Sequence, residues 1–489
     1  MIFQLALSIV LPLAIGFALI CVLWPQSRPT RSDLALKLSL SVGVGFGLLS
    51  CVYFLQLSFL KHSREYLFAE VITLFVVLAA SLAYRIIRRK GAAASMPQRE
   101  PGAKTKLSKT IPIAFFVALP SSITAFVFYA LKRPHGDWDA WAVFNMKARF
   151  LFRAGDHWRD FYSDPLQWSG PDYPLLLSSS IAACWTIVNQ ETLIVPATIA
   201  MLFTFASVGI VFSSISILRG KTQGYLAGLV LLCTPYFIIH GANQYADIPV
   251  AFFYLSTIVL LTLQDEVWEK EKGLLILAGL IAGLTAWTKN EGILFIILVI
   301  AARFVVTFRR HYIKSYLRQL LYFAAGLVPV LLIIFYFKVT VAAQNGYLAP
   351  LEESSLMSRV LDVSRYQTIG DYLIKKGLVF GNWAVAIIPL LAFYLLLLGI
   401  QLDEKRKRNV IASLSILGLM FLGFLAIYVI SSRDVDWLIV TSLDRLISQL
   451  WPSIIFIFFL SVKTPEEALM KEEVVSSPAL EPTVSQDYV

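Results

Sequence analysis

Residues 409–431 read NVIASLSILGLMFLGFLAIYVIS, an apolar run without a charged side chain. A helix of this length can cross the hydrocarbon core of a bilayer, about 30 Å thick, and it satisfies its own backbone hydrogen bonds. Directly before the run stand Lys405, Arg406, Lys407 and Arg408. Lys and Arg gather on the cytoplasmic side of membrane spans, so this stretch predicts both a transmembrane helix and its orientation.

Similar apolar runs recur along the chain of 489 residues, which is 57% hydrophobic and 15% charged. Soluble domains carry roughly 25% charged residues, so water is not the main solvent of this protein. We predict an all-α, polytopic transmembrane helical bundle with about 13 spans. The predicted spans lie at residues 3–24, 34–57, 65–84, 109–131, 194–217, 223–241, 248–264, 273–287, 292–308, 319–341, 376–400, 409–431 and 446–462. The net charge of +10 comes mainly from Lys and Arg between the runs, which indicates membrane orientation and not a nucleic-acid partner.

The chain divides into three predicted parts. Residues 1–108 form N-terminal transmembrane helices and a basic cytoplasmic linker at 85–108, and the first span is retained because no Lys or Arg precedes it. Residues 109–462 form a second transmembrane part with a long outer loop at 132–175. Residues 463–489 lack helical periodicity and predict a disordered cytoplasmic tail.

Residues 174–190 form a short apolar helix that polar residues interrupt. We treat it as an interfacial or re-entrant segment, which leaves the basic clusters at 219–221, 309–318 and 405–408 on the cytoplasmic side. Counting it as a full crossing would invert every later loop and place these clusters outside. The predicted topology therefore depends on this segment.

Under this topology, the polar residues that flank the apolar runs face outward. They are Asp137 and Asp139, Tyr245 and Asp247, Lys289, Asn290 and Glu291, and the stretch 433–445. Their convergence predicts one site on the extracytoplasmic face of an integral multi-pass membrane protein. The spans themselves hold few ionisable residues, chiefly Glu70 and Lys338, whereas ion-coupled transporters more often bury such groups near the midplane.

The outer loop predicts an amphipathic juxtamembrane helix just after Asp137 and Asp139. One face carries Trp141, Phe144, Ala148, Leu151 and Phe152, and the residues lying mostly away from it are Asn145, Lys147, Arg149 and Arg153. Such a helix rests in the headgroup layer, with its aromatic face in lipid and its basic residues near phosphates. This would hold the two carboxylates at the membrane surface. The alternative is that the acids only cap the helix.

The other outward residues also have two interpretations each. Asp247 either takes part in a site or caps a helix whose first turn contains Pro249. Lys289 and Glu291 either bind a ligand or pair with each other at the surface. Arg445 opens a predicted span, at the positive end of a helix dipole, which indicates an anionic partner such as phosphate. Its alternative is a side chain that snorkels to lipid headgroups.

These residues resemble the C-type (GT-C) membrane glycosyltransferases, the clan of protein O-mannosyltransferases and of lipid A aminoarabinose transferases. The resemblance covers roughly residues 109–462, which would be the catalytic domain. It rests on motifs in the family's order, namely Asp137 to Asp139, Arg153 to Trp158, Pro171 to Leu176, Ala246 to Pro249, Lys289 to Gly292, and Arg445.

The resemblance implies transfer of a sugar from a polyprenyl-phosphate donor, held among membrane lipids, to a hydroxyl of a lipid, glycan or protein. A positioned carboxylate would take the proton of the hydroxyl, and cations would stabilise the departing phosphate. Direct displacement would invert the anomeric centre. The candidates are Asp139 as base, with Asp137 and Asp247 also catalytic, Lys289 and Arg445 with Arg149 in reserve for the phosphate, and Glu291, Asn290, Tyr245 and Tyr173 in support.

Several points depart from the family pattern or stay open. Asp137-Trp-Asp139 replaces the usual Asp-Glu, which leaves open which acid is the base, although counting back from Gly155 favours Asp139. No cofactor is certain, because Mg²⁺ or Mn²⁺ on Asp137 and Asp139 is one option and cationic side chains alone are another. Pro171-Asp172 replaces His-Pro, so a role for Asp172 does not follow. The alternative functions are a transporter or flippase for a lipid-linked or anionic substrate, and an envelope assembly protein.

Overall fold

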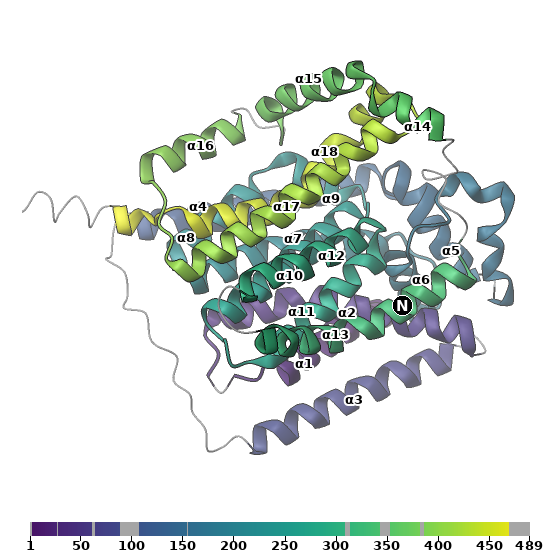
Figure 1. Cartoon of the computed structure of the whole chain (residues 1–489). Coiled ribbons are helices and arrows are strands. Elements are labelled where there is room, and N and C mark those ends of the chain that lie inside the picture. Colours follow the sequence, from purple (N-terminus) through teal and green to yellow (C-terminus); the bar gives the residue numbers. More distant parts are fainter. Residues whose placement is uncertain are drawn as a thin grey trace, which may run out of the picture.

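The computed structural model describes residues 2–26, 28–60, 64–88, 107–153, 155–308, 313–342, 353–381 and 386–468. Residues 89–106 of the predicted basic linker and residues 469–489 of the predicted tail lie outside this part. Within it, the named elements are all helices, and an isolated bridge joins Ile400 to Val462. The helices pack into one elongated bundle (Figure 1). The predicted all-α, polytopic class is confirmed.

The helices follow one another in this order. They are α1 (Ile2–Leu23), α2 (Arg31–Phe59), α3 (Arg64–Arg88), α4 (Leu107–Lys132), the π-helix η1 (Ala140–Phe144), α5 (Asn145–Arg153), the 3-10 helices η2 (Gly155–Tyr162) and η3 (Asp164–Ser169), α6 (Leu176–Val188), α7 (Ile194–Leu218), α8 (Lys221–Leu232), α9 (Pro235–Ala242), α10 (Asp247–Glu266), α11 (Lys272–Thr288), α12 (Glu291–Phe308), α13 (Ile313–Thr340), α14 (Glu353–Val360), α15 (Val363–Val379), α16 (Ile387–Leu398), α17 (Glu404–Ile430) and α18 (Val435–Ser461).

Nine helices in the described residues are long and apolar enough to cross a membrane, namely α1, α2, α3, α4, α7, α10, α13, α17 and α18. The pair α8 and α9 bends by 61° and would add a tenth span if it crosses as one unit. The predicted count of 13 is therefore not confirmed. Of the predicted spans outside these nine, 273–287 corresponds to the shorter apolar helix α11, and part of 376–400 corresponds to the shorter apolar helix α16.

The span predicted at 376–400 is wrong as a single helix. The structure divides this stretch between the end of α15 and the separate helix α16. Gly381, just after α15, has a φ of +91°, a left-handed conformation that ends a right-handed helix. Lys376, near the end of α15, pairs with Asp444 of α18 at 2.6 Å. The polar stretch thus packs on α18 and does not continue into an apolar span.

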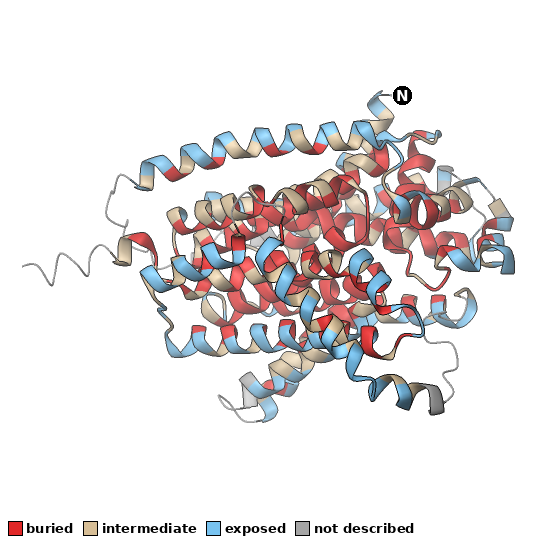
Figure 2. Cartoon of the chain, turned by 90° about the horizontal axis from the view of Figure 1, so that it is seen from above, coloured by how far each residue is buried: buried red, intermediate tan, exposed pale blue. Residues whose placement is uncertain are grey.

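Helix α10 forms the centre of the bundle and positions the site at its first residue. Its residues from Asp247 to Asp265 are all buried, and it packs against α7, α11 and α18. Figure 2 shows buried residues concentrated in the middle of the bundle, with exposed residues along the outer helices. Close approach of α11 and α13 needs small residues, since a Cβ on Gly279 would lie 1.9 Å from the carbonyl oxygen of Phe323. Packing therefore fixes the direction in which α10 presents its first residue.

The short helix predicted at 174–190 appears as α6, and it is enclosed by protein. All of its residues from Leu176 to Val188 are buried, and it packs against α2 and α5. This burial contradicts the interfacial alternative of the prediction and leaves the re-entrant alternative. The 13 residues of α6 are also too few for a helix that crosses the hydrocarbon core.

The predicted amphipathic helix of the outer loop is present as η1 and α5, and most of its predicted apolar face packs against protein, whereas Trp141 of that face is 40% exposed. Phe144, Ala148 and Leu151 are buried in the protein core, because α6 offers them an apolar protein surface. Lys147 was expected to lie away from this face near phosphates, and it is instead completely buried. Trp138, 57% exposed, is one of the aromatic residues that remain at the surface.

The first residues of the predicted tail are packed on the bundle. Arg219, at the end of α7, donates to the carbonyl oxygen of Val462 at 3.1 Å and to the carboxylate of Glu467 at 2.7 Å. Thr464 accepts a hydrogen bond from the backbone N–H of Glu467 and so caps this turn. The chain is therefore held to the helices through residue 468.

Candidate active site

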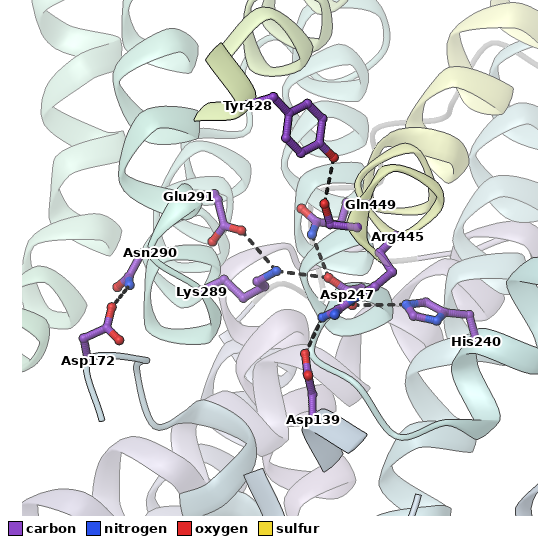
Figure 3. Close-up of polar contacts among 11 residues, drawn as sticks. Asp139, Asp172, His240, Asp247, Lys289, Asn290, Glu291, Tyr428, Arg445 and Gln449 are labelled. Carbon is purple, nitrogen blue, oxygen red and sulfur yellow. Dashed lines mark hydrogen bonds and ion pairs between the residues drawn. The ribbon is translucent and has the colours of Figure 1, made fainter. Parts of the chain in front are cut away.

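Five charged side chains from four separate segments meet at the end of the bundle where α10 begins. They are Asp139, Arg445, Asp247, Lys289 and Glu291, and we call them the ion-pair network (Figure 3). Asp139 precedes η1, Asp247 starts α10, Lys289 and Glu291 flank the connection from α11 to α12, and Arg445 lies in α18. The convergence predicted for these residues is present in the structure.

Asp247 is the centre of the ion-pair network. Its side chain is only 1% exposed, and a buried carboxylate is costly unless its oxygens are hydrogen-bonded. Oδ1 accepts from Lys289 Nζ at 3.0 Å and from Gln449 Nε2 at 2.7 Å. Oδ2 accepts from Arg445 Nε at 2.9 Å and lies 3.1 Å from His240 Nε2. With four partners on two oxygens, Asp247 is placed to hold the cations and has little capacity left for a substrate.

The charges alternate along the ion-pair network. Arg445 pairs with Asp139 through Nη2 and with Asp247 through Nε, and Lys289 pairs with Asp247 and, at 3.1 Å, with Glu291. The two end carboxylates are partly exposed, at 26% for Asp139 and 27% for Glu291. Burial alone would lower the pKa of Lys289, but the carboxylates of Asp247 and Glu291 outweigh it and hold the pKa above the ordinary lysine value. Lys289 is therefore a fixed positive charge.

Arg445 does not open a helix, which corrects the dipole argument made from the sequence. Helix α18 begins at Val435, so Arg445 lies well inside it, and Asp434 caps the first turn through the backbone N–H of Trp437. The guanidinium lies over the ring of Tyr245, 4.6 Å from the ring centre, which is a cation–π geometry. Its position is set by side-chain contacts and not by the helix terminus.

The ring of Tyr245 lies beside Asp139 and Arg445. The ring also contacts His240 edge to face at 5.2 Å. Burial, together with the negative charges of Asp139 and Asp137, raises the pKa of Tyr245 to about 12. Its hydroxyl therefore stays protonated at neutral pH and can act as a hydrogen-bond donor.

Asp137 and Arg149, both predicted site residues, form ion pairs of their own outside the ion-pair network. Asp137 pairs with Arg133 and accepts from the backbone N–H of Trp138 at 2.9 Å, so both of these contacts are local in the sequence. Arg149 Nε lies 3.6 Å from Glu191 Oε2, and Arg149 Nη2 lies 3.4 Å from His135 Nδ1. Within the described part of the chain, neither side chain forms an ion pair or hydrogen bond with a residue of the ion-pair network.

The segment 170–175 connects the network with a second set of polar contacts. Asp172, 5% exposed, accepts from Asn290 Nδ2 at 2.8 Å, and Lys338 Nζ donates to Asn290 Oδ1 at 2.8 Å and to the backbone carbonyl of Asp172. Tyr173 interacts electrostatically with Lys289 and Arg445. Asn290 and Tyr173, predicted as supporting residues, thus lie beside the network.

Sequence reasoning did not find His240, Gln449 and the structural role of Lys147. His240 stacks on Tyr236 at 5.3 Å in the last turn of α9, and its only sequence signal is a polar residue in an apolar run. Gln449 follows Arg445 by four residues, and that spacing places both on one face of a helix. Lys147 donates to the backbone carbonyls of Gly170 and Tyr173, which no sequence pattern indicates.

The side chains around Asp137 and Asp139 bear on whether these two carboxylates could bind Mg²⁺ or Mn²⁺. Among the described residues, no three His, Cys, Asp or Glu side chains are grouped so that they could hold a metal ion. Asp137 and Asp139 each face an arginine instead.

Comparison with known proteins adds one finding. The model of the dolichyl-phosphate-mannose-protein mannosyltransferase family matches residues 172–336, about a third of the chain. The matched part contains Asp172, Asp247 and Lys289, whereas Asp139 and Arg445 lie outside it. No match to a curated protein or to a solved structure was found. The family match and the helical membrane fold together confirm the resemblance to GT-C membrane glycosyltransferases and support a glycosyltransferase of the mannosyltransferase type.

Proposed function

We propose that the protein transfers a sugar from a polyprenyl-phosphate-linked donor to a hydroxyl group of a lipid, glycan or protein, with inversion at the anomeric carbon. The observation that carries the proposal is the contact between Asp139 and Arg445 in the ion-pair network. It puts a partly exposed carboxylate, suited to take a proton, beside a guanidinium suited to bind phosphate.

In this reaction the hydroxyl oxygen bonds to the anomeric carbon as the bond from that carbon to the phosphate oxygen breaks. Asp139 takes the hydroxyl proton, and the polyprenyl phosphate leaves with the bonding electrons. Arg445 and Lys289 stabilise the growing negative charge, and because Asp247 fixes both cations in advance, little reorganisation is needed. Tyr173 and Tyr245 line this region, and Glu291 and Asn290 support Lys289 and the 170–175 segment.

The extracytoplasmic location of the site is part of the proposal. Asp247 begins α10, and Glu266 at the other end of the same helix lies 3.4 Å from Arg406. Arg406 belongs to the basic cluster 405–408, and such clusters stay in the cytoplasm. The opposite ends of one buried helix thus carry the site and the cytoplasmic marker, which supports an outward-facing site.

The first experiment measures sugar transfer by the Asp139→Asn variant, using membranes and a panel of labelled polyprenyl-phosphate sugars. We expect loss of transfer by about 100-fold or more, with donor binding retained. The panel also identifies the sugar, hexose or pentose, and the molecule that gains the label identifies the acceptor. Normal transfer by Asp139→Asn would rule out Asp139 as the base.

Three further measurements test the stereochemistry, the use of a metal and the alternative function. A product with retained anomeric configuration would exclude direct displacement. Loss of transfer in EDTA, restored by Mg²⁺ or Mn²⁺, would show that a divalent metal takes part. Transport of the lipid-linked substrate without transfer of its sugar would favour the transporter or flippase alternative.

A further inference from the structure

The proposed function requires Arg445 to bind phosphate and Asp139 to accept a proton, yet in the structure these two side chains are bound to each other. Arg445 Nη2 donates to Asp139 Oδ2. Within the described residues this is the one side-chain hydrogen bond that the Asp139 carboxylate accepts. The guanidinium occupies one oxygen of this carboxylate, and the same guanidinium is the group proposed to bind the donor phosphate. The Asp139 carboxylate and the donor phosphate therefore compete for Arg445.

The two contacts of Arg445 differ in how firmly they are held. Its Nε contact is with Asp247, which is 1% exposed and fixed by Lys289, Gln449 and His240 as well. Its Nη2 contact is with Asp139, which is 26% exposed and starts a short helix in a loop. Water competes better for the partly exposed pair, so the contact with Asp139 is the weaker one. The guanidinium can turn away from Asp139 and remain attached to Asp247.

A phosphate is the ligand that would draw Arg445 away. The guanidinium can give two parallel hydrogen bonds to phosphate oxygens, whereas only Nη2 engages Asp139 here. The positive charges of the network are otherwise compensated, since Lys289 is shared by Asp247 and Glu291. The donor phosphate thus has to compete with Asp139 or Asp247 for Arg445. Asp139 is held by Arg445 more weakly than Asp247 is, so Asp139 is the one that the phosphate can displace.

We propose that the phosphate of the donor displaces Asp139 from Arg445, so that donor binding releases both oxygens of the catalytic carboxylate. This inference rests on the proposed function and adds a step to it, the exchange of carboxylate for phosphate on Arg445. In the absence of donor, the guanidinium of Arg445 holds Oδ2 of Asp139.

The test uses polyprenyl phosphate without a sugar as the probe and measures its dissociation constant for the purified full-length protein. If Asp139 competes with phosphate for Arg445, Asp139→Asn should bind the probe about fivefold more tightly than the wild type. The matched control is Asp137→Asn, which removes the same charge two residues away from a carboxylate paired with Arg133. Its affinity should match the wild type. Equal gains in both variants would indicate a general charge effect and overturn the proposal.

A double-mutant cycle makes the test specific to this pair. In an Arg445→Gln background, Asp139→Asn should no longer change the affinity for polyprenyl phosphate, because the contested guanidinium is absent. A gain that persists in this background would overturn the exchange. Unchanged or weaker binding by Asp139→Asn that has lost sugar transfer would also overturn it, while leaving the proposed function intact. Absence of probe binding to the wild type would overturn both.

Discussion

Lys147 Nζ donates hydrogen bonds of 3.1 Å to the backbone carbonyl of Tyr173 and 3.2 Å to that of Gly170, from a side chain that is completely buried. Gly170 has a φ of +62°, and a Cβ at this position would lie 2.5 Å from the ring of Tyr173. Lys147 therefore fixes the turn that places Tyr173 near Lys289 and Arg445. This contact joins α5 to the site without taking part in the ion-pair network.

The first prediction concerns the pH dependence of stability. Burial lowers the pKa of Lys147 to about 7 from its ordinary value of 10.5, with Asp172 opposing and Lys338 reinforcing the shift. Between these values the unfolded chain carries a proton on Lys147 that the folded protein does not, so stability rises with pH across this window. The contribution is at most about 5 kcal/mol, from about 1.36 kcal/mol per pKa unit.

Thermal unfolding of the wild type and of Lys147→Met, measured from pH 6 to pH 10, checks this prediction. The neutral amine of the wild type keeps its two hydrogen bonds at high pH, so Lys147→Met should be clearly less stable at pH 9.5. Toward pH 6 the wild type must bury a charge that methionine lacks, so the difference should shrink or reverse. A difference that stays constant with pH would contradict the assignment.

The second prediction concerns Asp247, the centre of the ion-pair network. Asp247→Asn keeps the shape of the side chain but removes the charge that compensates Lys289 and Arg445. Breaking a buried ion pair by removing one partner costs about 3 to 5 kcal/mol. We expect a loss of stability of this size, measured by denaturant or thermal unfolding, and a loss of sugar transfer. Asp137→Asn, whose ion pair is exposed, should change stability by less than about 1 kcal/mol.

The third prediction separates two cations that were both candidates for the donor phosphate. Lys289→Gln should lower kcat/KM by about 100-fold or more, because Lys289 is a buried cation of the ion-pair network. Arg149→Gln should retain nearly full transfer, since Arg149 faces Glu191, which Arg153 also binds. Comparison of kcat/KM for the two variants with one donor checks this. A large loss in Arg149→Gln would show that Arg149 reaches the donor in a state other than the one described.

The membrane class and most helix positions follow from the sequence because apolar length and basic clusters are local properties. The run at 409–431 with its four preceding basic residues corresponds to α17, which ends at Ile430, as expected from such a pattern. The stretch 376–400 was misassigned, since hydropathy alone does not show that its first residues pack on α18 through Lys376. Likewise, the apolar face around Phe144 and Ala148 indicated burial but not whether lipid or α6 would cover it.

The candidate site was only partly predictable for the same reason. Asp139, Asp247, Lys289 and Arg445 could be chosen because charges flanking apolar helices are rare and visible. Which of them touch could not be derived, because the contacts join segments far apart in the sequence, whereas Asp137 pairs with Arg133 only four residues away. His240 and Gln449 carry only weak sequence signals, a polar residue in an apolar run and a spacing of four from Arg445, because their importance comes from the buried carboxylate that they contact.

The fourth prediction assigns His240 and Gln449 as positioning residues that act through Asp247. His240→Phe preserves the stacking on Tyr236 but removes the nitrogen that lies 3.1 Å from Asp247, and Gln449→Leu removes the 2.7 Å hydrogen bond. Each loss should cost about 1 to 3 kcal/mol of stability. Each should also lower kcat by about tenfold, because Arg445 and Lys289 are then held less precisely by Asp247.

Double variants that also carry Asp247→Asn distinguish a positioning role from a merely structural one. Because both residues hold the same carboxylate, the effects of His240→Phe and Gln449→Leu on kcat should disappear in an Asp247→Asn background, in which the carboxylate is already gone. The control is Tyr428→Phe, which removes a buried hydrogen bond of 2.8 Å to Ser442 without a contact to Asp247. Its effect on stability should add to that of Asp247→Asn. If the His240 and Gln449 effects on kcat add as well, these residues act independently of Asp247 and the assignment fails.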